Sequence, residues 1–205
     1  MFEFGDIRFR PLEKDDLKLL HTWENDYELI MYSRSRPINV LSMAQIERQY
    51  EERMKEEKNI YFIVELVASN EPVGIATIRR EEWGEIKAAN IGTYIGKKEL
   101  WGKGLGMQIT LALLDICFLN LNVERCEAFS VAFNTRAHKT LESCGFRRGG
   151  VFRCSAFVTG KRWDSYFFDM LREEYLERRE ALLKQVLGDR LQEYLKKHFP
   201  LENAI

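Results

Sequence analysis

The chain has 205 residues, of which 45% are hydrophobic and 31% are charged, and its formal net charge is −1. These values fit one globular domain with an appendage, and they exclude the global basic field that holds nucleic acid or an anionic membrane. The first residues show no basic stretch before an apolar run, and no apolar stretch is long enough to span a bilayer. We therefore expect a cytoplasmic protein without nucleic-acid or membrane partners.

The first half of the chain alternates strand-like and helix-like patterns. Alternating apolar runs predict strands over 7–10, 60–64, 73–78 and 88–95. Helical spacing predicts a helix over 15–23, and a loop is expected over 34–39. Ser42 followed by Gln45 is a capping-box pattern, which predicts a second helix from there to about residue 58.

The second half begins with a glycine-rich loop, which is followed by an apolar helix over about 105–119. A strand is expected over 127–133, and Asn134 is expected to cap a helix that ends at Gly145. A short turn containing Gly160 predicts a hairpin between strands over 151–158 and 162–171. The chain is therefore expected to be α+β, with a mixed, mostly antiparallel sheet of about seven strands flanked by helices.

The last part of the chain is highly charged and reads as an amphipathic helix that is broken at Gly188. Its apolar stripe repeats every four residues and consists of Leu183, Leu187, Leu191 and Leu195. We expect one domain over 1–176 and a C-terminal helical extension over 177–205. The extension either packs on the domain or forms a dimer seam, so monomer and homodimer both stay open.

The four cysteines are Cys117, Cys126, Cys144 and Cys154. None of them has the C-x-x-C spacing of a zinc site, and three lie in apolar runs. They are expected to be small buried hydrophobic residues, and no metal is expected.

The loop over 101–106, Trp-Gly-Lys-Gly-Leu-Gly, combines three glycines with the start of a helix. Glycine lets the backbone approach a ligand closely, and the free amides and dipole of a helix N-terminus attract an anion such as a pyrophosphate. A plain strand-to-helix turn is the simpler alternative. A P-loop would need Ser or Thr after Lys103, and the third glycine of a dinucleotide fingerprint is missing.

This loop and a second motif resemble the GNAT superfamily of N-acetyltransferases. The superfamily's acetyl-CoA loop, Q/R-x-x-G-x-G/A, matches residues 101–106 with Trp101 in the place of Gln or Arg. The second motif matches Asn134, Ala137, Leu141, Gly145 and Phe146. An opening match at 10–12 and Asp16, and a closing match at Gly160 and Asp164, resemble the branch of RimJ/RimL-type ribosomal-protein N-terminal acetyltransferases. The resemblance spans about residues 7 to 176.

The resemblance implies that acetyl-CoA is the co-substrate. It also implies that the fourth and fifth strands, over 88–95 and 127–133, splay apart, with the pantetheine arm in the gap. The pyrophosphate would lie on the amides of the glycine loop, and the amine would attack the thioester directly in a ternary complex. The cofactor contacts implied are Tyr94, Ile95, Lys103, Gly104, Leu105, Gly106, Met107, Gln108, Asn134 and Lys139.

For catalysis, the reaction needs a neutral amine, a stabilised oxyanion and a protonated leaving thiolate. A backbone amide at Tyr94 or Ile95 is the expected oxyanion donor, and Asn134 is the expected polar side chain. The usual tyrosine acid is replaced by Leu141 and the usual glutamate base by Asn90. A water chain to Glu65, Glu82 or Glu127 is an alternative base. Tyr32 and Arg34 are expected to bind the acceptor, and His138 is a weaker candidate for a cofactor contact.

The absence of the usual glutamate base affects which amine is expected as the acceptor. An α-amine has a pKa of about 7.7–8.0 and a lysine ε-amine about 10.4, so a far larger share of α-amines is neutral at pH 7. The expected acceptor is therefore the N-terminal α-amine of a protein or peptide. The alternatives are a small-molecule amine, such as a polyamine, an amino sugar or an antibiotic, and a CoA-binding module without catalysis. A polyamine would need an acidic cleft, to which Glu81, Glu82 and Glu85 are candidate contributors.

Overall fold

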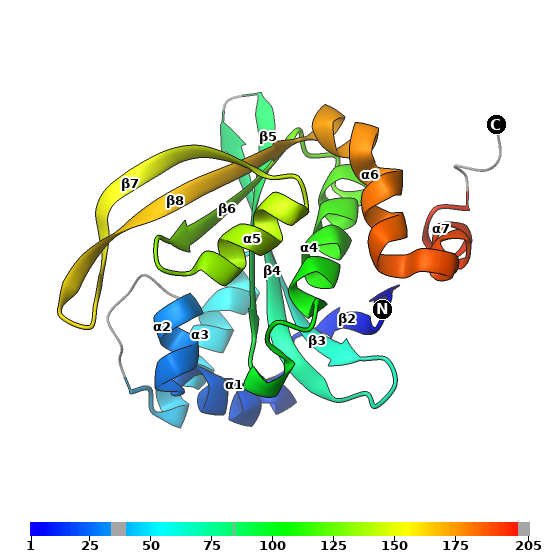
Figure 1. The fold of residues 1–205 in the computed structure, drawn as a ribbon. Coiled ribbons are helices and arrows are strands. Elements are labelled where there is room, and N and C mark those ends of the chain that lie inside the picture. The colour runs from blue at the N-terminus through cyan, green and yellow to red at the C-terminus, as the bar shows by residue number, and fades with distance from the viewer. Residues whose placement is uncertain (34–39, 84, 201–205) are drawn as a thin grey trace.

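The computed structural model describes residues 1–33, 40–83 and 85–200. Within these residues, eight strands form one sheet in the order β1-β2-β3-β4-β5-β6-β8-β7, as Figure 1 shows. The strands are β1 (Phe2–Phe4), β2 (Ile7–Pro11), β3 (Asn59–Leu66), β4 (Pro72–Trp83), β5 (Ile86–Ile95), β6 (Arg125–Val131), β7 (Arg147–Val158) and β8 (Lys161–Leu171). The β5–β6 pair is parallel and its neighbours are antiparallel. The expected mixed, mostly antiparallel sheet is therefore confirmed.

The helices lie on both faces of this sheet. They are α1 (Leu17–Glu24), α2 (Tyr27–Ser33), α3 (Met43–Lys55), α4 (Leu105–Asp115), α5 (Thr135–Ser143), α6 (Arg172–Leu187) and α7 (Leu191–His198). The capping box at Ser42 is present, because the Gln45 amide donates to its hydroxyl and its own amide donates to the Gln45 side chain. The loop expected over 34–39 lies outside the described residues.

Two elements were not expected from the sequence. The strand β1 forms because Gly5, with a φ of 59°, turns the chain back so that β1 pairs with β2. Only three residues long, β1 is too short for an alternating pattern to reveal it. The helix α2 is also short, at seven residues, and it continues closely from α1.

The strands β5 and β6 part after a short common stretch. They pair over residues 88–90 and 125–127, with Asn90 opposite Glu127 as the last pair, while β5 continues to Ile95 and β6 to Val131. The expected splay between these two strands is therefore confirmed. Beyond the last pair, one edge of each strand faces a gap, and that gap positions the site.

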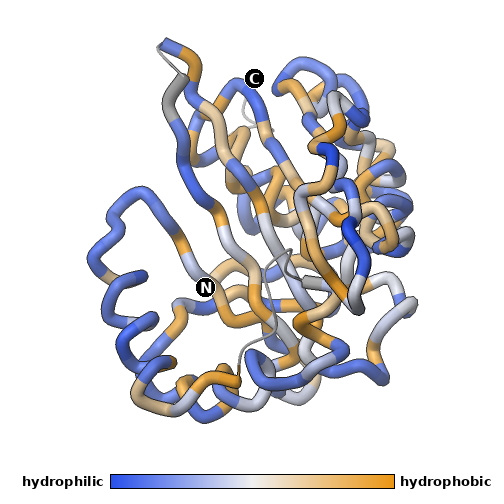
Figure 2. The backbone as a smooth tube through the Cα atoms, turned by 90° about the vertical axis from the view of Figure 1, so that its left-hand side faces the viewer, coloured by the Kyte–Doolittle hydropathy of each residue, from blue (hydrophilic) through white to orange (hydrophobic). Residues whose placement is uncertain are grey.

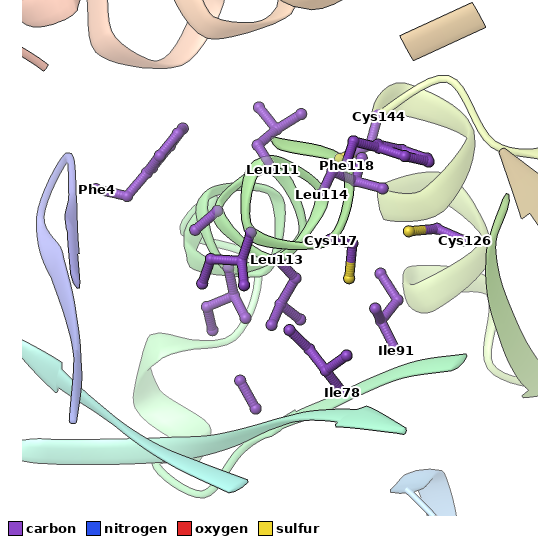
Figure 3. Close-up of a cluster of buried hydrophobic side chains, with 14 of the residues drawn as sticks. Phe4, Ile78, Ile91, Leu111, Leu113, Leu114, Cys117, Phe118, Cys126 and Cys144 are labelled. Carbon is purple, nitrogen blue, oxygen red and sulfur yellow. The ribbon is translucent and has the colours of Figure 1, made fainter. Parts of the chain in front are cut away.

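The main core lies between the sheet and α4. Figure 3 looks along this helix, and its leucine side chains point outward in several directions, toward the strands that carry Ile78 and Ile91 and toward the opposite side. A helix that is apolar all round is covered on all sides, and α5 and α6 complete the cover of α4. A second cluster packs α1, α2 and α3 against the other face of β3 and β4. In Figure 2 the hydrophobic stretches gather in the interior, whereas most hydrophilic segments lie toward the outside.

The C-terminal helices pack on the domain. Gly188, with a φ of 55°, separates α6 from α7, as the sequence predicts. Tyr175, Leu183, Leu187 and Leu191 belong to the same core cluster as α4. Within the described residues, no helix is both long and apolar enough to cross a membrane.

A buried carboxylate fastens these helices to α4. Asp115, which is 0% exposed, accepts hydrogen bonds from Tyr175 Oη (2.8 Å), Arg179 Nε (2.6 Å) and Tyr194 Oη (2.6 Å). Burial and the neighbouring Asp115 charge raise the pKa of Tyr175 well above its usual value. The phenol therefore stays protonated and can donate to the carboxylate.

The cysteine expectation needs one correction. Cys117, Cys126 and Cys144 are buried, but Cys154 is exposed. The β7–β8 register shifts between Phe152 and Ala156, and Cys154 within this bulge has a φ of 53°. A bulge redirects the side chains of a strand, and a sequence pattern alone does not reveal it.

Candidate active site

The glycine loop opens α4 beside the end of β5. Gly104 is the N-cap residue, with a φ of 84°, and Gly102 has a φ of 75°. A Cβ atom added at either position would meet nothing within 4 Å. The loop therefore needs glycine for its backbone conformation, and it leaves open space in front of its amides.

Three of the loop amides are already bonded locally. The amide of Lys103 donates to Leu100 O, and those of Met107 and Gln108 donate to Gly104 O. Among the described residues, the amides of Gly104, Leu105 and Gly106 have no such partner. These three amides at a helix N-terminus are therefore the ones available to an anion, out of the stretch from 103 to 108 expected from the sequence.

Two side chains of this stretch face away from a ligand. Gln108 accepts from the Asp6 amide (2.8 Å) and donates to the Asp6 carboxylate (2.9 Å), so it ties α4 to the β1–β2 turn. Leu105 is part of the main core. Leu105 can therefore offer a cofactor only its backbone amide, whereas the amide of Gln108 is already bonded to Gly104 O.

A cavity of about 470 Å³, here called the donor cavity, leads from this loop into the splay. It is lined by the ends of β5 and β6, the start of α4 and one side of α5. Among the sequence-predicted residues, the structure brings together here Tyr32, Tyr94, Ile95, Gly104, Gly106, Met107, Asn134, Lys139 and Leu141. Arg136 also lines it, whereas Lys103 does not.

Trp101 closes the loop onto β5. Its indole Nε1 donates to Ile95 O at 2.8 Å, and the Arg136 guanidinium lies over its ring at 4.1 Å from the centroid. The same guanidinium lies 4.8 Å from the Tyr32 ring. The hydrogen bond to Ile95 and the stacked Arg136 explain why a Trp serves in the first position of the motif. Its indole holds the glycine loop, β5 and α5 together.

We expect Trp101→Phe to lower the affinity for acetyl-CoA by about 5- to 10-fold, because a hydrogen bond worth about 1 kcal/mol is lost and Ile95 O is left unpaired. The free energy of unfolding should fall by a similar amount. Calorimetric titration with acetyl-CoA measures the first effect and urea unfolding the second. An unchanged affinity would show that the loop keeps its position without this bond.

The backbone of β5 alternates between β4 and the gap. Gly96 donates to Val73 O of the preceding segment, and Tyr94 lies opposite Ile75 in β4, with its carbonyl directed toward Gly74. In a strand, the N–H and C=O of one residue point to the same side, and those of the next residue point to the other side. The backbone N–H and C=O of Tyr94, like the N–H of Gly96, therefore face β4. Of the two expected oxyanion donors, the amide of Ile95 faces the gap and that of Tyr94 does not; the amide of Thr93, which was not expected, faces the gap as well.

Asn134 has two structural partners. Its side-chain oxygen accepts from the Ala137 amide (3.2 Å), which caps α5, and its nitrogen donates to Tyr32 O (2.9 Å). The cap is as expected, whereas the bond to Tyr32 joins residues 102 positions apart. Asn134 therefore positions the last turn of α2 beside the cleft.

His138 faces the core and not the cofactor. It is buried, its Nε2 lies 3.0 Å from Val131 O, and its ring packs against Tyr166 and Phe168. Burial lowers the pKa of His138 below its usual value. The neutral ring with Nε2–H donates to the carbonyl at the end of β6, so this residue fixes the splayed strand.

A second and larger cavity of about 1060 Å³, here called the acceptor cavity, lies on the other side of the splay. The end of α3, the ends of β3 and β4, and the strands β6 and β8 form its walls. Its charged lining residues are Arg48, Glu52, Arg53, Glu56, Glu57, Lys58, Arg79, Arg80 and Glu81. Glu81 was expected here, Glu85 does not line the cavity, and the side chain of Glu82 and the whole of Arg34 are outside the described residues.

Of the three glutamates expected as an alternative base, the two with described side chains, Glu65 and Glu127, line neither the donor nor the acceptor cavity. Glu65 pairs with Arg10 (2.6 Å) and Glu127 with Arg125 (2.6 Å). Asn90 accepts from Arg79 Nη2 at 3.1 Å. Leu141 lines the donor cavity as a purely apolar side chain.

The linings of the two cavities share Tyr32, Phe129 and Ser130. One cavity ends at an anion-binding helix N-terminus and the other is open and charged. A cleft of this form holds two substrates, one with a phosphate-bearing tail, and lets their reactive ends meet in the splay. The fold and the site thus define a group transferase that uses a nucleotide-linked donor.

Comparisons with known proteins agree with this class. Residues 6–147 match the model of the acetyltransferase (GNAT) domain. The uncharacterized N-acetyltransferase p20 of Bacillus licheniformis is 28% identical over 171 residues, which cover 82% of this chain and 94% of that protein. The spermidine N(1)-acetyltransferase of Vibrio cholerae is 26% identical over 181 residues, 86% of this chain and 99% of that protein.

A solved structure shares the fold. The spermidine N-acetyltransferase from Vibrio cholerae, in complex with CoA and spermine, superposes with a TM-score of 0.76 at 23% identity, over 83% of this chain and 98% of that one. The family match covers more than half of the chain, so the chain belongs to the GNAT acetyltransferases. It is an N-acetyltransferase, and acetyl-CoA is its co-substrate.

Proposed function

We propose that this enzyme acetylates a primary amine of a small polycationic molecule, with a polyamine as the first candidate. The observation that carries the proposal is a pair of neighbouring carboxylates, Glu56 and Glu57, here called the acidic wall, at the end of α3 in an acceptor cavity whose described charged lining also includes five cations and two further glutamates. Glu56 and Glu57 are exposed there, and among the described residues neither has a cation within ion-pair distance. The spermidine acetyltransferase of Vibrio cholerae, a relative over most of both chains, supports the same class of acceptor.

The other charges that line the acceptor cavity leave Glu56 and Glu57 as the carboxylates for the substrate. Helix α3 directs its C-terminal end toward the cavity, and the negative end of a helix dipole favours a cation. Arg48 lies 4.0 Å from Glu52, Arg53 lies 3.5 Å from Glu24 and Arg79 lies 3.7 Å from Glu81, so these cations have carboxylate neighbours. The Arg80 guanidinium donates to the backbone carbonyls of Glu57 and Lys58. Glu56 and Glu57 are thus the acids available to hold the ammonium groups of a substrate that do not react.

The reacting amine needs the opposite environment. A polyamine amine is almost fully protonated at pH 7, with a pKa near that of lysine, about 10.4. The Arg79 guanidinium reaches Asn90 at the root of the splay, and a nearby positive charge favours the neutral form of an amine. The amine would then attack the thioester directly, with the amide of Ile95 or Thr93 as the oxyanion donor.

A protein N-terminus is the second candidate acceptor. The RimJ/RimL-like opening and closing motifs favour it, and so does the lack of a glutamate base in the splay, because an α-amine needs less help to lose its proton. We also propose that Asn134 and Lys139 contact the cofactor and that Tyr32 contacts the acceptor. A domain over 1–176 with an extension over 177–205 remains our proposed division.

An acetylation assay with four amines tests the acceptor. Spermidine, spermine, kanamycin and a peptide with a free N-terminal alanine are compared by the release of CoA thiol. We expect kcat/KM for the polyamines to exceed that for the peptide by at least about tenfold, equivalent to about 1.4 kcal/mol of transition-state binding. A preference for the peptide would establish the second candidate instead.

Variants that remove the charges of Glu56 and Glu57 test whether the acceptor cavity binds the polyamine. The double variant Glu56→Gln and Glu57→Gln should raise KM for spermidine by about 5- to 10-fold, at about 0.5–1 kcal/mol per exposed charge pair, and leave kcat within about twofold. The matched control, Glu177→Gln with Glu180→Gln, removes the same charge from the exposed face of α6. Equal effects of the two variants would contradict a specific role for the acidic wall.

A further inference from the structure

The reaction needs a route for one proton. When the amine attacks the acetyl carbon, its nitrogen must lose a proton, and the departing thiolate must gain one. Leu141 cannot transfer a proton, and the Asn90 amide does not titrate. The group that moves the proton must therefore be sought among the other side chains of the splay.

Ser130 is the unusual polar residue at this place. It is 8% exposed, and its Oγ is fully buried without a hydrogen-bond partner among the described residues. A buried hydroxyl without a partner costs about 1–3 kcal/mol, so proteins rarely keep one without a reason. It stands on β6 three residues beyond Glu127, which is the last residue of that strand paired with β5.

Ser130 lies where the two cavities meet. Among the described lining residues, only Ser130, Tyr32 and Phe129 line both the donor and the acceptor cavity. A donor and an acceptor that enter from the two cavities can react only where the cavities meet. Phe129 has no exchangeable proton, which leaves the hydroxyls of Ser130 and Tyr32.

Tyr32 has a different environment. Its ring packs edge-on against Trp101 and Phe133 and beneath the Arg136 guanidinium, and it is partly exposed. These contacts fit a side chain that forms the wall of the cleft. Ser130 is the residue of this shared set whose hydroxyl is buried and without a hydrogen-bond partner among the described residues.

We propose that Ser130 is a catalytic residue that carries the proton from the amine to the leaving thiolate. The nitrogen lone pair forms the N–C bond, and the C–S bond breaks with its electron pair on sulfur. The amine proton passes to Ser130 Oγ while the hydroxyl proton passes to sulfur, so the serine is regenerated and the products are the amide and CoA thiol. A hydroxyl both donates and accepts, which this relay requires. The proposal rests on the proposed acetyltransferase function but not on which amine is the acceptor.

The test compares Ser130→Ala with wild type on whichever amine the wild type acetylates best. We expect kcat to fall by about 100-fold, the lower end of the range for proton-transfer groups, while the Kd for acetyl-CoA stays within about twofold. The free energy of unfolding should be unchanged or increase, because the variant removes a buried hydroxyl without a partner. Ser130→Thr keeps the hydroxyl and should recover most of the lost kcat.

Two further variants decide between explanations. Thr22→Ala removes a hydroxyl that donates to Lys18 O at 3.1 Å on α1, outside both cavities, and it should leave both kcat and the Kd for acetyl-CoA unchanged. Tyr32→Phe tests the rival hydroxyl. A kcat loss in Tyr32→Phe with full activity in Ser130→Ala would overturn the proposal, as would a Ser130→Ala loss that follows lowered stability. A wild type that binds acetyl-CoA but acetylates no amine would overturn the proposed function as well.

Discussion

Gly104→Val is expected to abolish measurable acetyl transfer and to weaken the binding of acetyl-CoA by more than about 100-fold. Gly104 caps α4 in the left-handed region, and the space beyond its missing Cβ opens on the donor cavity. A valine there would fill the space before the free amides of Leu105 and Gly106. The anion would lose its contact with the helix N-terminus, whose amides and dipole both act only at close range.

Gly160→Val is the matched control. Gly160 also has a positive φ, 75°, and open space where a Cβ would lie, but it is in the turn between β7 and β8. Both variants should lose about 1–2 kcal/mol of stability, the cost of a left-handed conformation for a residue with a Cβ. Only Gly104→Val should lose acetyl-CoA binding in calorimetric titration. Normal affinity in Gly104→Val would show that the donor phosphates bind elsewhere.

Asp115→Asn is expected to lower the free energy of unfolding by about 3–5 kcal/mol. The change leaves the Arg179 guanidinium, which is 9% exposed, without its buried counter-charge, and it weakens the bonds from Tyr175 and Tyr194. Breaking one side of a buried ion pair is costly because the remaining buried charge loses the carboxylate that offsets its desolvation. Urea unfolding followed by circular dichroism measures the effect.

Glu3→Gln is the control for that prediction. Glu3 pairs with Lys197 and so also links the N-terminal strand to α7, but its side chain is 28% exposed and that of Lys197 53%. Surface pairs contribute at most about 1 kcal/mol. If Asp115→Asn cost no more than Glu3→Gln, the C-terminal helices would be held by apolar packing alone.

The two predictions concern separate parts of the molecule. The glycine loop, the proposed binding site for the donor, lies at the start of α4, and Asp115 at the end of the same helix bonds to residues of α6 and α7. The helix therefore joins the donor site to the C-terminal segment. Because Leu183, Leu187 and Leu191 belong to the core of α4, removal of residues 177–205 would expose a large part of that core.

The sequence alone determined the elements with strong local signals. The capping box at Ser42, the N-cap at Asn134, the break at Gly188 and the loop over 101–106 each depend on residues close together in the chain. The family resemblance carried by the motifs at 101–106 and 134–146 implied the splayed sheet and the acetyl-CoA co-substrate. The local signals did not reveal β1, because three residues show no periodicity.

The tertiary structure decided which side chains meet. The sequence gives no sign that the backbone of Tyr94 faces β4, that Asn134 donates to Tyr32 102 residues away, or that Gln108 turns toward Asp6. Nor did any motif distinguish Ser130, whose hydroxyl matters only because two cavities meet beside it. The physical reason is that helix starts, turns and caps are set by neighbouring residues, whereas the direction of a peptide group and the partners of a side chain are set by strand pairing and packing between distant segments.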